Sequence, residues 1–65
     1  MQEREVQFIQ SCLASGQPVL VVYNGQTYQV HGCQVVGGHI QFGLIMPPDV
    51  QVVDANRLTL TGRVN

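Results

Sequence analysis

The sequence has no lysine and no tryptophan, and charged side chains of either sign are few. Three arginines and four acidic residues give a formal net charge of −1 at pH 7 over 65 residues. Cationic side chains on phosphates supply most of the non-specific affinity of proteins for nucleic acid. The composition therefore excludes binding that depends on phosphate charge. A nucleic-acid site on this chain would have to recognise bases through a shaped surface.

Long apolar runs are also missing. No stretch approaches the roughly 20 apolar residues that a membrane span needs. The first residues, MQEREV, carry too many charges for an export signal. We therefore expect a cytoplasmic protein without a membrane partner.

Cysteine is scarce, with two residues in the whole chain. Cys12 and Cys33 fall in segments of different periodicity and, together with His31 and His39, show no CxxC or HxxxH spacing. Zinc sites and disulfide frameworks are typically marked by such regular spacings. We interpret both cysteines as small buried apolar groups, and we expect no metal or other cofactor.

Recognisable catalytic motifs are absent as well. The four acids, Glu3, Glu5, Asp49 and Asp54, show no paired spacing, and no serine accompanies a histidine and an acid in a known motif. The glycine pair in GGHIQFG precedes a strand pattern, whereas a phosphate-binding loop precedes a helix. We therefore do not expect an enzyme.

The chain is short for an independent domain. Residues 1–65 form a single domain, and a core of this size supplies only about 3–5 kcal/mol of stability. Such a chain needs either a staple or a copy of itself. The cysteine pattern does not favour a staple, so the second route is the expectation.

The first part of the chain has helical periodicity. Val6, Ile9 and Leu13 recur at the spacing of an amphipathic helix, which we predict over residues 2–15. Gly16 follows as the expected C-terminal cap, and Pro18 prevents continuation.

From Pro18 onward the period changes to two, which predicts five strands joined by short turns. Gly32 and Gly43 lie inside otherwise regular strands, where a sharp bend is a common reason for glycine. The fold class is therefore mainly β with an N-terminal α-helix, arranged as a small, strongly bent, five-stranded antiparallel barrel of the SH3-like kind. The predicted strands cover residues 18–23, 26–35, 39–46, 50–53 and 57–61.

The first of these strands is apolar on both faces. Val19, Leu20, Val21 and Val22 follow one another, whereas a strand with one buried face should alternate. Either both faces are covered within the chain or a partner covers one. We expect the partner to be another copy of the same chain.

The segments FIQSCLASGQ, PVLVVYNGQTYQVHG, HIQFGLI and VVDANRLTL together resemble the Sm-like family, and most closely its bacterial branch, the RNA chaperone Hfq. The resemblance covers nearly the whole chain and lies in the order, spacing and total length of the segments. It implies a homo-oligomeric ring, commonly a hexamer, in which the fourth strand of one copy pairs with the fifth strand of the next. It also implies binding of single-stranded RNA, rich in uridine or adenine, in post-transcriptional regulation.

The resemblance suggests five candidate RNA-binding residues. Gln41 lies where Sm-like pores read a base, Asn56 and Arg57 lie in the turn before the last strand, and Tyr23 lies near an aromatic that Hfq offers to purines. His39 completes the set. Each also has a structural interpretation, since tyrosines pack across strands and asparagine forms turns. Where Hfq carries Tyr-Lys-His-Ala, this chain has Asp-Ala-Asn-Arg.

Two alternatives remain open. The segment GGHIQFGLIMPPDVQVVDANRL is similar to the carbon-storage-regulator family CsrA, which implies an interlocked dimer that binds messenger RNA. A ring that serves a structural or protein-interaction role without RNA would equally account for the low charge. The mass of the assembly separates a ring from a dimer, and an RNA titration separates the two kinds of ring.

Overall fold

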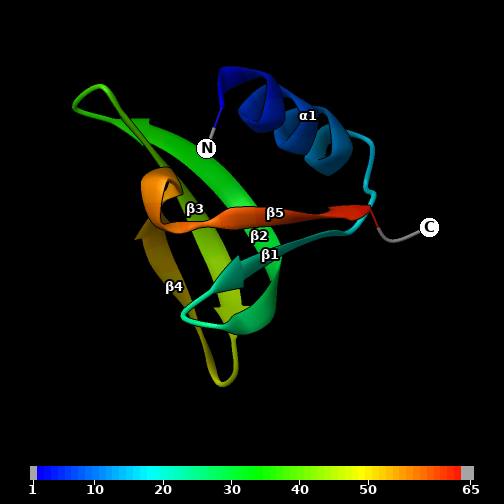
Figure 1. Cartoon of the computed structure of the whole chain (residues 1–65), viewed down its shortest axis with the longest axis vertical. Coiled ribbons are helices and arrows are strands. Elements are labelled where there is room, and N and C mark those ends of the chain that lie inside the picture. The colour runs from blue at the N-terminus through cyan, green and yellow to red at the C-terminus, as the bar shows by residue number, and fades with distance from the viewer. Residues whose placement is uncertain (1, 64–65) are drawn as a thin grey trace.

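The computed structural model describes residues 2–63 as one helix followed by a five-stranded antiparallel sheet (Figure 1). Each boundary lies within two residues of the position predicted from sequence, and the third strand matches at both ends. The elements are α1 (Glu3–Ala14), β1 (Val19–Tyr23), β2 (Gln26–Val36), β3 (His39–Met46), β4 (Asp49–Asp54), the 3₁₀ turn η1 (Ala55–Arg57) and β5 (Thr59–Arg63).

The sheet is bent but does not close into a barrel. Its strands lie in the order β4-β3-β2-β1-β5, and within residues 2–63 no ladder joins β4 to β5. The long strand β2 belongs to both halves of the sheet, and its register against β3 shifts between Val30 and Gly32. The expected bend is therefore present, whereas the closed barrel was a wrong prediction. The reason is that η1 carries the chain from one edge of the sheet to the other without pairing them (Figure 1).

The core lies between the helix and the concave side of the sheet. Phe42 and Leu44 alternate along β3 and are fully buried, as their spacing predicted, and Ile9 of α1 packs among them. The helical face differs by one position from the prediction, because Cys12 is buried whereas Leu13 is only half-buried. Within residues 2–63, no helix has the length and apolar content needed to cross a membrane.

Strand β1 explains the unbroken apolar run. Val19 and Val21 are fully buried in the core, whereas Leu20 and Val22 point to the other face and remain half-buried. The chain therefore covers one face of this strand completely and the other in part.

The helix ends as the sequence predicted. Gly16 adopts a φ of 76°, its N–H donates to the carbonyl of Leu13 at 3.1 Å, and the N–H of Gln17 donates to the carbonyl of Cys12 at 2.9 Å. These two bonds make a Schellman cap, in which a left-handed glycine satisfies the last carbonyls of the helix.

The β1–β2 turn allows a matched test of glycine. Asn24 and Gly25 have φ values of 51° and 75°, whereas Gly32 lies outside the left-handed region, and a Cβ added to Gly32 would meet no atom within 4 Å. We expect Gly25→Ala to lower the free energy of unfolding by about 1 kcal/mol and Gly32→Ala to leave it nearly unchanged. Urea denaturation followed by circular dichroism measures both, and equal losses would contradict this interpretation of the turn.

Candidate functional site

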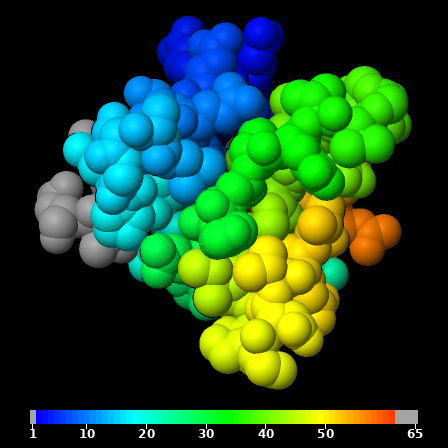
Figure 2. Space-filling view, turned by 180° about the vertical axis from the view of Figure 1, so that it is seen from behind, coloured from blue at the N-terminus to red at the C-terminus, as the bar shows by residue number. Residues whose placement is uncertain are grey.

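A hollow of about 390 Å³ lies where three separate elements meet. The first turn of α1, the tip of the β2–β3 hairpin and the η1 turn surround it. Figure 2 shows the hairpin, in green, beside the blue helix, with β4 in yellow toward the opposite end of that face. The lining residues are Glu3, Val6, Gly38, His39, Ile40, Asp54, Ala55 and Asn56.

Asp54 is the best-anchored polar group of this hollow. As the residue before η1 it caps the turn, because its Oδ1 accepts a hydrogen bond from the backbone N–H of Asn56 at 3.0 Å. Its Oδ2 lies 3.8 Å from Nδ1 of His39, which is too long for a hydrogen bond. The side chains of His39 and Asp54 are 68% and 31% exposed, so their attraction when the histidine is protonated contributes only about 0–1 kcal/mol.

The structure brings two of the five predicted site residues into this hollow. His39 begins β3 and Asn56 lies in η1, and both line it. Arg57 is exposed beside Asn56 but is not part of the lining. Among the described residues no ion pair joins Arg57 to Asp54.

Gln41 lies next to the hollow rather than in it. In the sheet it is opposite Gln34 of β2 on one side and Asp54 of β4 on the other. Its Oε1 accepts a hydrogen bond from Nε2 of Gln34 at 3.2 Å. A base that Gln41 recognises would have to bond to its amide group beside this contact.

Tyr23 is separated from the other candidates. Tyr23 ends β1 beside the β1–β2 turn, which lies at the opposite end of β2 from the β2–β3 hairpin. Its side chain is half-buried and packs against the core. Tyr28 lies diagonally across the ladder from it and donates a hydrogen bond to Oε1 of Gln26 at 2.8 Å. Tyr23 therefore does not form a common site with His39 and Asn56 within one chain.

Asp54 is the functional candidate that sequence reasoning did not include. Its signal was an aspartate placed two residues before an asparagine at the end of a strand, which is typical of a side chain that caps a turn. Glu3 could not have been found, because nothing in the sequence places the first helical turn beside the β2–β3 hairpin.

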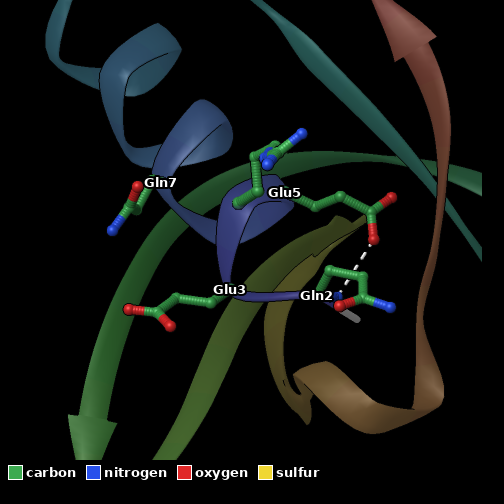
Figure 3. A pocket seen from close by; sticks show the side chains of 5 residues that line it. Gln2, Glu3, Glu5 and Gln7 are labelled. Atoms are coloured by element: carbon green, nitrogen blue, oxygen red, sulfur yellow. Dashed lines mark hydrogen bonds between the residues drawn. The ribbon is translucent and has the colours of Figure 1, made fainter.

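A larger hollow, of about 600 Å³, surrounds the first turn of α1 but has no convergent groups. Figure 3 shows Glu3 and Gln7 pointing to one side of the helix and Glu5 to the other. The backbone N–H of Gln2 donates to Oε1 of Glu5 at 3.0 Å, which fixes the start of the helix. This hollow is open helix surface and not a site.

The cysteines and acids gather no metal site in the part of the chain described. No group of three or more histidine, cysteine, aspartate or glutamate side chains lies close enough to hold an ion among residues 2–63. Cys12 and Cys33 are free thiols, and Sγ of Cys33 lies 3.5 Å from Nε2 of Gln10, which donates to it.

Comparisons of the chain with protein-family models, with curated proteins and with solved structures find no match. The strand order, the open sheet edges and the geometry of the hollow beside η1 are therefore the features that bear on function.

Proposed function

We propose that the chain assembles into a closed ring of identical copies, of the Sm-like kind, and that the ring binds single-stranded RNA. The observation that carries the proposal is the pair of open edges of the sheet, on β4 and β5. In the proposed ring, β4 of each copy pairs with β5 of the next, which continues the sheet from copy to copy.

The β4 edge supports this assembly through its exposed apolar side chains. Val50 and Val52 are 45% and 56% exposed on an edge strand. An uncovered apolar edge is a template for uncontrolled pairing, and natural proteins cover or charge such edges. A head-to-tail contact that closes after about five to seven copies covers every edge at once.

The RNA part of the proposal is supported by where the polar candidates lie. His39 and Asn56 line one hollow, and Arg57 follows Asn56 on η1, so a ring would repeat all three around its axis. Because the chain has no lysine, recognition would depend on bases, through hydrogen bonds and stacking, more than on phosphates.

This mode of binding predicts a weak dependence on salt. With Arg57 as the one cation that each copy carries on η1, we expect the affinity for short uridine-rich or adenine-rich oligonucleotides to fall about threefold between 50 and 200 mM salt for each copy whose Arg57 contacts a phosphate. Fluorescence anisotropy titrations at the two salt concentrations measure it. Arg57→Gln should remove the remaining salt dependence, and Arg4→Gln, on the helix, is the matched control. No binding to either oligonucleotide at low salt would exclude the RNA function.

A protein-interaction ring is the second candidate, and the β2–β3 hairpin favours it. Val35 and Val36 are 64% and 51% exposed and lie on opposite faces of the hairpin. Apolar groups exposed on both faces of a hairpin are typical of a surface that contacts another protein. The same titrations decide between the candidates, since this ring would bind neither oligonucleotide.

The interlocked dimer is the third candidate. Within residues 2–63, β5 pairs with β1 of its own chain. An interlocked dimer instead shares its sheets between two chains. A native mass of two copies would nevertheless favour that alternative over the ring.

A further inference from the structure

The hollow beside η1 offers hydrogen-bond acceptors more than donors. Oδ1 of Asp54 is held by the backbone N–H of Asn56, which fixes the orientation of the carboxylate. Oδ2 lies 3.8 Å from the imidazole of His39 and keeps its capacity to accept. Glu3, in the first turn of α1, also lines the hollow and carries a second carboxylate.

The same hollow has an apolar surface on which a flat group can rest. Val6 and Ala55 line it as buried members of the core, and Ile40, which also lines it, is half-buried. His39, with 68% of its side chain exposed, provides a ring at the rim on which a base can stack. An apolar surface with one oriented carboxylate suits a planar ligand that carries adjacent N–H donors.

Guanine is the RNA base with that chemistry, and we infer that the hollow is a pocket for an unpaired guanine base. This inference rests on the proposed RNA function. The N1–H and the N2 amino group of guanine lie side by side and can donate together to one carboxylate, here that of Asp54. His39 stacks on the base, and the apolar surface receives its other face.

The other bases fit this carboxylate less well. Uracil has a single N–H flanked by two carbonyls. If that N–H donated to Asp54, the two carbonyl oxygens would lie close to the carboxylate oxygens, and all of these oxygens are acceptors. Adenine and cytosine each offer one amino group next to a ring acceptor. The carboxylates of Glu3 and Asp54 also disfavour phosphates inside the hollow. The base therefore enters it, and the backbone stays outside.

The test compares labelled uridine hexamers that carry one guanosine, adenosine or inosine at the third position. A bidentate base contact discriminates by about 1–3 kcal/mol, so we expect the guanosine strand to bind about 5- to 150-fold more tightly than the adenosine strand. The inosine strand, whose base lacks the N2 amino group, should bind with an affinity between those of the other two strands. Asp54→Asn, which still caps the turn, should abolish the preference, whereas Asp49→Asn removes the same charge elsewhere and should leave it intact.

The outcomes separate the inference from the function on which it rests. Equal affinity for all three strands, unchanged in Asp54→Asn, overturns the guanine pocket and leaves the RNA function standing. No binding of any strand overturns both. If an arginine-rich peptide perturbs the amide NMR signals of His39 and Asn56 while the guanosine strand does not, the hollow is an acidic peptide site and the inference is wrong.

Discussion

Replacing Val50 and Val52 with lysine should convert the assembly into single chains. Both side chains lie on the β4 edge, where the proposed ring buries them against β5 of the next copy. Losing this apolar burial and placing two ammonium groups in the contact should weaken each interface by about 2–4 kcal/mol or more. Lysine on edge strands is also the device by which natural sheets avoid pairing.

A matched variant separates this effect from a general effect of charge. Val35→Lys with Val36→Lys adds the same two charges at side chains of similar exposure, on the β2–β3 hairpin rather than on β4. Size-exclusion chromatography with light scattering should then give single chains for the β4 variant and the wild-type mass for the hairpin variant. Assembly retained in the β4 variant would place the contact elsewhere.

Replacing Phe42 with alanine should unfold the protein. Phe42 is fully buried in the central part of β3, opposite Cys33 on one side and Val53 on the other. Truncating a buried phenylalanine costs about 3–5 kcal/mol, which equals the whole stability expected of a core of this size. We therefore expect no cooperative thermal transition by circular dichroism at concentrations where the wild type melts cooperatively.

The control for this core variant lies on the same strand and the same face. Ile40→Ala also removes a β3 side chain, but Ile40 is only half-buried at the end of the core. The Ile40→Ala substitution should lower the free energy of unfolding by about 1–2 kcal/mol, and the protein should keep a cooperative thermal transition. Because assembly stabilises folded chains, both variants should be compared at one protein concentration. A Phe42→Ala protein that melts like the Ile40→Ala protein would contradict the position assigned to the core.

The sequence was most informative where local chemistry settles local structure. Strand β3 was predicted residue for residue, because Gly37-Gly38 and Pro47-Pro48 bound it and its apolar side chains alternate. The end of α1 was predicted for the same reason, since Gly16 provides the left-handed residue that closes a helix. These features depend on residues that are neighbours along the chain.

The prediction failed where the answer depends on distant parts of the chain. The final strand was expected to begin at Arg57, but Asp54 caps a 3₁₀ turn over Ala55–Arg57 and delays β5 to Thr59. Closure of the barrel depends on how far the bend in β2 brings β4 toward β5, and no local pattern encodes that distance. The same limit applies to the site. His39 and Asn56 were named as candidates, whereas their proximity to Glu3 follows from the packing of α1.

Native mass spectrometry of the wild-type chain at micromolar concentration decides whether the ring exists. We expect one dominant species of about five to seven copies of the 7.1 kDa chain, most simply a hexamer, with few single chains. A folded single chain that melts cooperatively at the same concentration would show that the β4 and β5 edges need no partner, and it would contradict the ring.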